Sequence, residues 1–538
     1  MACFIMMPCR PWKTSTPEMS RADGLALFLS LLAVAAAVLV AQNVFENMAH
    51  LEDEFAYLWQ AQILTEGKLT LPSPEHSNSF LVPFVVDYRG LRFGKYPLGW
   101  PVLLSFGVSL GMRSVVNPLL AGLAVWLIYR LGRKIFNPPV GVLAAGLALS
   151  SPFFLINGGS LLSHMWSLVL SSALLLGWLD GVAAWKEDPA RKEDGPHKTW
   201  LPALLAGFSL GALALTRPLT AAAVALPLAF HGVWLLLRGS PGQKQRLLGV
   251  GALGLGIGLL HFVWQLAVTG EAARNPYTLW WAYDKLGFGP GFGVTGSGHT
   301  LQQAWWNTKH SLRAGMSDLF GWGKLSWLFL PFGLWAGRRK GPVYLLLGIP
   351  LALIVSYGAY WVGSWLLGPR YYFEALPALA VLTAAGIFWL AGWPLAGAGQ
   401  FSIPAGWRQV RSVLAAALLV GLVTLNLRYY LPTRLASLRG LYTIERQDLE
   451  PFQNPAVREL APALIIVHAD PWMSYGSLLE LTDPTRDTPF LFAWSLGPKA
   501  DARLAADYTG LRGIYHYYPD QDPWVLYTAP VPELESSQ

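Results

Sequence analysis

The chain has very little cysteine and very little charge for its length. Only two of its 538 residues are cysteine, and both of these, Cys3 and Cys9, lie within the first nine positions. An internal disulfide framework is therefore excluded. Charged residues make up 13% of the chain, about half the fraction that is usual in soluble domains. A soluble globular protein does not fit this composition.

The chain is rich in apolar residues and tryptophan. Hydrophobic residues account for 53% of it, tryptophan occurs 25 times, and the mean hydropathy is +0.38. This composition predicts a polytopic membrane protein. No basic stripe with interleaved aromatic residues is present, so we expect no nucleic-acid partner.

Eleven apolar segments are candidates for membrane spans, which need about 20 mostly apolar residues. They are 24–45, 116–129, 140–156, 165–184, 200–216, 219–237, 247–269, 325–337, 342–362, 371–391 and 412–430. Segment 97–111 is shorter and contains two prolines, so we interpret it as interfacial or re-entrant. With this segment excluded, the basic clusters of the short loops fall on one side of the membrane. The positive-inside rule then places the N-terminus in the cytoplasm and the C-terminus outside.

The predicted fold class is an all-α polytopic bundle of about 11 transmembrane helices in the inner or plasma membrane. Interfacial helices are expected in its first outer loop, and a small C-terminal α/β domain is expected on the extracytoplasmic side. The expected divisions are a cytoplasmic leader at 1–23, a transmembrane domain at 24–431 with outer loops at 46–115 and 271–324, and the C-terminal domain at 432–538.

The C-terminal part differs from the rest in charge and in pattern. Residues 432–538 carry a net charge of −6, while the remainder carries +13. The stretches "APALIIVHAD", "TPFLFAWSL" and "LRGIYHYY" predict strands, and "KADARLAADY" predicts a helix.

Polar residues that are unusual in an apolar chain gather, in this topology, at one membrane face. Acids follow the first span in "EDE" at 52–54, and cations occur at Lys95, Arg217 and Arg370. Histidines occur at His164 in "SLLSHMW" and at His299 in "GSGHT". A cavity that pairs carboxylates with several cations at the interface suits an anionic, membrane-borne substrate.

Three segments carry a resemblance to a known family. They are "EDEFAYLWQAQILTEGKL" after the first span, "KYPLGWPVLL" at the end of the first outer loop, and "GPRYYFEALPALAVLTAAG" late in the bundle. Over residues 24–430 the chain resembles polytopic glycosyltransferases of the GT-C superfamily, especially bacterial relatives of the lipid A aminoarabinose transferase and the protein O-mannosyltransferases. The resemblance implies transfer of a sugar, with inversion, from a polyprenyl-phosphate donor to a lipid, glycan or protein acceptor among the membrane lipids of the outer face.

The resemblance also implies roles for particular residues. Asp53 is expected to be the general base, since an attacking hydroxyl must lose its proton, and Glu54 is expected to orient the acceptor or bind a metal. Lys95 matches a family lysine that contacts phosphate, and Arg370 is the second candidate phosphate ligand. The full set of expected substrate-binding residues is Lys95, Tyr96, Arg370, Tyr371, Arg217, His164, His299 and Tyr57. A divalent metal ion is left open, with Asp53, Glu54 and His164 as candidate ligands.

Other interpretations remain open at this point. Acids at 52–54 also suit a solvated helix N-terminus, where the helix dipole stabilises them, and Lys95 also suits a side chain that extends to the lipid headgroups. Two other functions remain open, a flippase or transporter of lipid-linked saccharides and a catalytically inactive scaffold with this fold.

Overall fold

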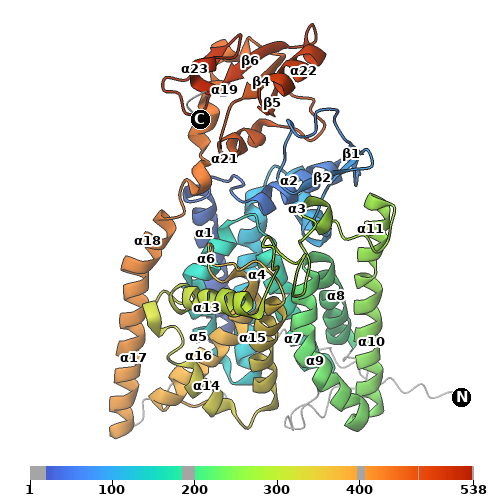
Figure 1. The fold of residues 1–538 in the computed structure, drawn as a ribbon. Coiled ribbons are helices and arrows are strands. Elements are labelled where there is room, and N and C mark those ends of the chain that lie inside the picture. The colour runs from blue at the N-terminus through green and yellow to red at the C-terminus, as the bar shows by residue number, and fades with distance from the viewer. Residues whose placement is uncertain (1–19, 184–199, 397–405, 471, 536–538) are drawn as a thin grey trace, which may run out of the picture.

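The computed structural model describes residues 20–183, 200–396, 406–470 and 472–535. Most of the expected leader at 1–23 therefore lies outside the described residues. The described chain forms a long helical bundle, and a smaller unit with a sheet is stacked on one end of it (Figure 1).

Thirteen helices make up the bundle in the part of the chain that the structure describes. They are α1 (Arg21–Asn43), α4 (Val116–Ile135), α5 (Pro138–Leu149), α6 (Pro152–Gly159), α7 (His164–Gly181), α8 (Trp200–Thr216), α9 (Pro218–Arg238), α10 (Pro241–Gly258), α11 (Leu260–Thr269), α14 (Leu330–Gly337), α15 (Gly341–Gly358), α16 (Leu376–Ala391) and α17 (Trp407–Leu425). Several begin with a polar cap followed by proline, as at Asn137 before α5 and Ser240 before α10, which is a strong helix-start pattern.

Seven helices, or eight if one bent pair counts as a single span, are long and apolar enough to cross a membrane among the described residues. The expected count of eleven therefore stays a prediction. Helices α8 and α14, which lie in two of the other expected spans, have only 17 and 8 residues, fewer than the roughly 20 of a typical span. The span expected at 140–156 is broken into α5 and α6, which are bent by 63°, because Ser151 caps a new helix that has Pro152 in its first turn.

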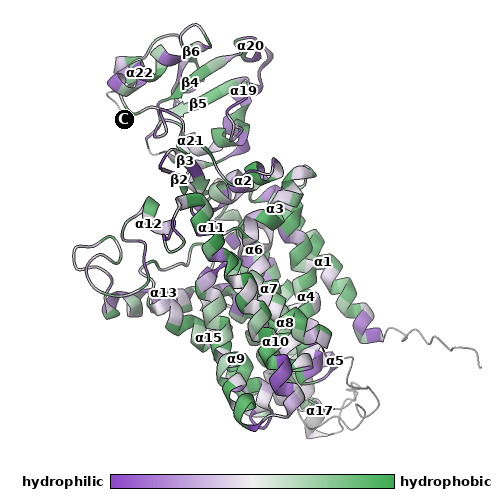
Figure 2. Ribbon diagram, turned by 90° about the vertical axis from the view of Figure 1, so that its right-hand side faces the viewer, coloured by the Kyte–Doolittle hydropathy of each residue, from purple (hydrophilic) through white to green (hydrophobic). Residues whose placement is uncertain are grey.

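The chain is an integral membrane protein, and its helices differ in how much of their length is buried inside the bundle. The segment Arg370–Ala391, which contains α16, is 89% buried and lies in the middle of the bundle, whereas the spans of α10 and α17 are only 17% buried. Those two helices stand at opposite edges (Figure 1). The outward faces of the bundle are apolar along most of their length (Figure 2), as a lipid-facing surface requires.

The first outer loop contains a long helix, a small sheet and a short helix. Helix α2 (Glu52–Thr65) is followed by β1 (Leu71–Pro72), β2 (Val85–Tyr88) and β3 (Leu91–Gly94), and then by α3 (Gly99–Ser109). The strands pair antiparallel in the order β1-β3-β2. The turn between β2 and β3 has positive φ at both Arg89 and Gly90, which matches the twist of a tight hairpin. Helix α3 has 11 residues, so the interpretation of 97–111 as shorter than a span is supported.

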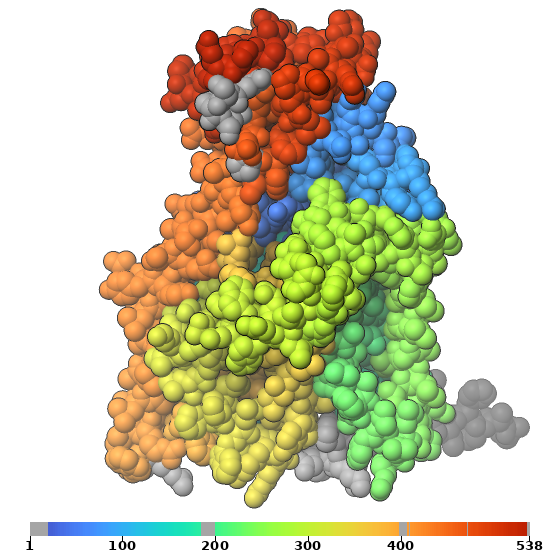
Figure 3. Space-filling model, in the orientation of Figure 1, coloured from blue at the N-terminus to red at the C-terminus, as the bar shows by residue number. Residues whose placement is uncertain are grey.

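The second outer loop contains α12 (Tyr277–Trp280) and α13 (Leu301–Asp318). Helix α13 runs across the bundle near the end of α15 (Figure 1). In the space-filling view a hollow opens between this loop and the orange C-terminal segment, with blue atoms from the start of the chain at its floor (Figure 3).

The C-terminal unit is built around a four-stranded sheet. Its strands are β4 (Ala463–Val467), β5 (Phe490–Trp494), β6 (Gly513–Tyr517) and β7 (Leu526–Tyr527), in the order β5-β4-β6-β7, with only β7 antiparallel. Helix α18 (Leu431–Ala436) continues the line of α17 beside the bundle (Figure 1), and the helices of the C-terminal unit are α19 (Glu450–Gln453), α20 (Pro455–Arg458), α21 (Met473–Gly476), α22 (Pro498–Tyr508) and α23 (Pro532–Glu535). The three strands and the helix predicted from the sequence are thus present, while the extracytoplasmic placement stays a prediction.

Candidate active site

Three segments distant in sequence meet at the carboxylate of Asp53, in the first turn of α2. Its Oδ2 lies 3.1 Å from Nη1 of Arg370, and its Oδ1 accepts a hydrogen bond from the Tyr96 hydroxyl. Arg370 also donates from Nε to Ser364 Oγ at 2.6 Å. The side chains of Asp53 and Arg370 are each 18% exposed, so a ligand at this end of the bundle can reach both.

The neighbouring Glu54 is fully buried. Its Oε2 accepts backbone N–H bonds from His50 at 2.8 Å and Leu51 at 3.1 Å, and its Oε1 accepts one from Leu161 at 2.7 Å. Burial raises the pKa of Glu54, and these N–H groups oppose that rise by holding the charged form. Both oxygens are engaged, so the described contacts give Glu54 a structural role that ties the start of α2 to the segment before α7, not a contact with an acceptor.

Lys95 lies beside this centre but is held by its own carboxylate. Its Nζ lies 3.3 Å from Asp284 Oδ2 and 3.4 Å from the centroid of the Phe84 ring. Three further rings, those of Trp281, Tyr96 and Tyr277, have centroids within 5.0–5.2 Å. Burial lowers the pKa of Lys95, while the charges of Asp284 and Asp53 act in the opposite direction.

Arg217 and a set of tyrosines form a second wall next to Arg370. Arg217 precedes α9 and donates from Nη2 to the Tyr357 hydroxyl at 2.9 Å. The Tyr357 ring stacks on Tyr371 with centroids 4.7 Å apart, and the guanidinium carbons of Arg217 and Arg370 are each 5.9 Å from the centre of the Tyr371 ring. The two arginines therefore both lie near the Tyr371 ring.

Tyr57 packs against Tyr96 and lies close to the start of α7. Its ring centroid is 4.7 Å from that of Tyr96, and its hydroxyl is 3.2 Å from Ser163 Oγ. Burial raises the pKa of Tyr57, and the nearby charge of Asp53 adds to the rise. Tyr57 is therefore a neutral hydroxyl beside the carboxylate.

The two histidines lie in different surroundings. His164, at the start of α7, is buried, and neither ring nitrogen has a hydrogen-bond partner among the described residues. His299 places Nε2 at 2.9 Å from the Gly358 carbonyl oxygen and stacks on Phe288. Among the described residues these contacts of His299 do not include Asp53, so the structure does not bring His299 to the carboxylate centre.

The residues suggested as metal ligands do not fit a metal site. Within residues 20–183, 200–396, 406–470 and 472–535, no three His, Cys, Asp or Glu side chains are grouped so that they could hold an ion. Both oxygens of Glu54 already accept backbone hydrogen bonds. We therefore assign no step of the chemistry to a metal.

Sequence reasoning missed two contributors. Asp284, from the second outer loop, accepts hydrogen bonds from the Tyr360 hydroxyl at 2.7 Å and from Trp361 Nε1 at 3.2 Å, in addition to pairing with Lys95. Tyr442, where the chain leaves the bundle, has a positive φ of 59° and lies within range of the charges of Glu52, Asp53 and Arg370. Nothing in the sequence pattern around Asp284 indicated its pairing with Lys95.

Comparisons with known proteins show which folds this chain is similar to. Residues 112–238 match the family model described as oligosaccharyl transferase STT3, N-terminal. The structure of ArnT from Cupriavidus metallidurans bound to undecaprenyl phosphate is similar over 92% of this chain and 93% of that chain, with a TM-score of 0.54 and 15% sequence identity. The chain has a GT-C fold.

A second GT-C structure is similar over nearly the same part of this chain. The archaeal oligosaccharyltransferase AglB from Archaeoglobus fulgidus, in complex with an inhibitory peptide and a dolichol-phosphate, has a TM-score of 0.52 and 14% identity, over 92% of this chain and 69% of that chain. No curated protein matches the chain by sequence. The resemblance to GT-C proteins that the sequence indicated is thus confirmed.

Proposed function

We propose that this chain is an inverting glycosyltransferase that moves a sugar from a polyprenyl-phosphate donor to a lipid, glycan or protein acceptor at the outer face of the membrane. The observation that carries the proposal is the ion pair of Asp53 and Arg370 at the end of a GT-C bundle. The similar fold of ArnT with undecaprenyl phosphate, and of AglB with dolichol-phosphate, supports a lipid-phosphate donor.

Asp53 is the proposed general base. The acceptor hydroxyl attacks the anomeric carbon and passes its proton to the Asp53 carboxylate, while the bond from the anomeric carbon to the phosphate oxygen breaks. A single displacement inverts the configuration and needs no second carboxylate as nucleophile. The hydrogen bond from Tyr96 fixes the orientation of the Asp53 carboxylate.

The leaving polyprenyl phosphate gains negative charge as that bond breaks, and fixed cations stabilise it best where water is scarce. Arg370 is the proposed primary phosphate ligand, because guanidinium groups bind phosphate oxygens in pairs and its side chain, 18% exposed beside Asp53, can be reached by a ligand. Lys95 and Arg217 are the proposed supporting cations. A phosphate held at Arg370 brings the anomeric carbon next to Asp53.

The flippase alternative is less well supported. Transporter sites usually lie near the bilayer midplane, on broken helices of repeated halves. Here Asp53 and Lys95 come from the first outer loop and Asp284 from the second, which favours chemistry at an interface. An inactive scaffold has no need of an ion pair between a partly exposed acid and a partly exposed arginine.

The test uses purified chain in liposomes that carry a polyprenyl-phosphate donor with a radiolabelled sugar. We expect label to move from the donor to an acceptor in a membrane lipid extract, with release of polyprenyl phosphate. If the donor stays intact but changes leaflet, the flippase interpretation replaces this one. If the donor is neither consumed nor moved with any acceptor extract, the proposal of transfer is wrong.

A further inference from the structure

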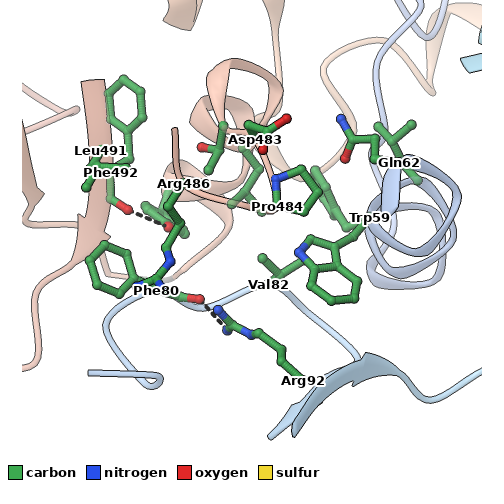
Figure 4. A pocket seen from close by; sticks show the side chains of 15 residues that line it. Trp59, Gln62, Phe80, Val82, Arg92, Asp483, Pro484, Arg486, Leu491 and Phe492 are labelled. Atoms are coloured by element: carbon green, nitrogen blue, oxygen red, sulfur yellow. Dashed lines mark hydrogen bonds between the residues drawn. The ribbon is translucent and has the colours of Figure 1, made fainter. Parts of the chain in front are cut away.

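A pocket separate from the Asp53 centre lies between the first outer loop and the C-terminal unit (Figure 4). About 540 Å³ of space lies among its lining residues, a figure that includes open solvent at the mouth, so it is a half-open cleft and not an enclosed cavity. Helix α2 contributes Phe55, Leu58, Trp59 and Gln62 to the wall. This spacing of three and four residues defines one helix face, and Asp53 lies on the opposite one. The same helix therefore presents one face to this pocket and the opposite face to the Asp53 centre.

One wall of the pocket carries a cation without an anionic partner. Arg486, on a turn of the C-terminal unit, has a positive φ of 65°, and its guanidinium carbon lies 5.3 Å from the centre of the Phe80 ring. Its guanidinium makes no hydrogen bond or ion pair with any of the residues that the structure describes, while its backbone N–H donates to the Asp483 carbonyl oxygen at 2.9 Å. The neighbouring Asp483 instead caps its own turn by accepting from the backbone N–H of Thr485 at 2.7 Å.

A second guanidinium lies on the other side of Phe80. Arg92 is 5% exposed, donates from Nη2 to the Phe80 carbonyl oxygen at 2.5 Å, and has Nε at 3.4 Å from Asp87. That Nε has no hydrogen-bond partner within the described chain. Burial lowers the pKa of Arg92, Asp87 opposes this, and the charge of Arg486 adds to the lowering. Two like charges close together in a pocket are stabilised by an anion between them.

The remaining lining suits a ring with polar edges. Trp59 is buried and faces the pocket beside Val82 and Pro484, and Gln62 lies at the rim (Figure 4). Thr482 and Asp483 add polar groups on the side of the C-terminal unit. Small-molecule sites commonly combine such an apolar, aromatic wall with a few convergent polar groups.

We propose that this pocket binds an acidic sugar unit, meaning a sugar ring that carries a carboxylate or a phosphate. Arg486 anchors the anionic group with support from Arg92, Trp59 packs against the ring, and Gln62 contacts hydroxyls at the mouth. The half-open shape admits one unit of a larger saccharide from the aqueous side. This binding goes beyond sugar transfer at Asp53 and does not depend on it.

Titration of the full chain in nanodiscs tests the proposal. The ligands are glucuronate and glucose 6-phosphate, with glucose and inorganic phosphate as the neutral and sugar-free controls, followed by ligand-observed NMR at low salt. We expect both acidic sugars to bind about tenfold or more tightly than either control, since a hydrogen bond to a charged group is worth that much. Equal affinity for phosphate and glucose 6-phosphate overturns the sugar part of the proposal, and binding of neither acidic sugar overturns it altogether.

Variants locate the site. Arg486→Gln should weaken binding of both acidic sugars about tenfold, and Arg486→Lys, which keeps the charge, should weaken it less. Arg503→Gln on the exposed face of α22 is the matched control and should bind as wild type. Gln62→Ala, at a half-exposed position, is the second test. It should weaken binding of the acidic sugars and leave the affinity for inorganic phosphate unchanged. Unchanged affinity in Arg486→Gln contradicts the assignment, and each variant is compared by its melting temperature to establish that it is folded.

Discussion

Arg370 Nη1 lies 3.1 Å from Asp53 Oδ2, which joins the first outer loop to the segment that leads into α16. Each member of this pair has a further contact, Asp53 with Tyr96 and Arg370 with Ser364. The pair thus presents an acid and a cation in a fixed relation at a part of the molecule that solvent reaches. Such an arrangement can hold an anionic leaving group and accept a proton within one site.

Replacing Arg370 by lysine should lower sugar transfer about 100-fold or more. Lysine keeps the charge but loses the planar group that contacts both Asp53 and Ser364. The rate of label transfer at saturating donor is the measurement. Arg434→Lys is the matched control, because Arg434 also pairs with an acid, the buried Asp318, away from this centre. Equal loss in both variants would indicate a general effect on folding and not a role in the site.

Lys95 should set the alkaline limit of activity. Because burial lowers its pKa, the ammonium group loses its proton at a lower pH than an ordinary lysine, and transfer should fall as the pH rises through this lowered value. In Lys95→Arg the cation persists, so the alkaline limb of kcat/KM should move to higher pH even if the maximum rate falls. An alkaline limb that stays in place in this variant assigns the limit to another group.

The lowered pKa of Lys95 makes stability change with pH in the opposite direction to activity. Between the lowered pKa of folded Lys95 and the ordinary value in the unfolded chain, the unfolded state binds more protons, so the Lys95 contribution to stability rises with pH across this window. Activity and stability should therefore diverge in this range. A melting temperature that falls there together with activity, and to the same degree in Lys95→Met, contradicts the assignment.

Asp284→Asn should move the alkaline limb in the other direction. The Asp284 carboxylate raises the pKa of Lys95 against the effect of burial, and asparagine removes that charge while it can still accept from Tyr360. The limb should shift to lower pH, with a larger effect on KM for the donor than on kcat. Asp318→Asn serves as the control for the loss of a buried acid, and a limb that moves equally in both variants would count against the Lys95 pairing.

Glu54→Gln should destabilise the protein without a specific effect on the chemistry. Glutamine supplies one acceptor oxygen where three backbone N–H groups need two, so the expected cost is about 1–3 kcal/mol. A lower melting temperature with kcat per folded molecule near wild type is the expected result. Glu52→Gln, two residues earlier in the chain, is the control for stability. Loss of kcat in Glu54→Gln at an unchanged melting temperature would restore Glu54 to the chemistry.

The sequence predicts the fold class and much of the site because both depend on local signals. Long apolar segments marked the bundle, and strand patterns in 432–538 located β4, β5 and β6. The acids at 52–54 stood out because an apolar chain has few of them. The structural role of Glu54 could have been predicted in part from its spacing, because an acid at the third helical position after the N-cap residue Leu51 matches a capping box.

Other features depend on contacts that no local pattern records. Asp284 lies in a Gly- and aromatic-rich loop without periodicity, and its partner Lys95 comes from a different loop. The break between α5 and α6 was signalled by Ser151 and Pro152, but the apolar run around them hid it. The pocket between α2 and the C-terminal unit exists only when the chain is folded, because Trp59 and Arg486 belong to opposite ends of the sequence.

The most direct test of the account is the rate of sugar transfer by Asp53→Asn in liposomes with a polyprenyl-phosphate donor. The variant keeps the shape of the side chain but cannot accept the acceptor's proton, so transfer should fall by about 100-fold or more, while donor binding and melting temperature stay close to wild type. Transfer at the wild-type rate in a folded Asp53→Asn protein would contradict the claim that Asp53 is the base.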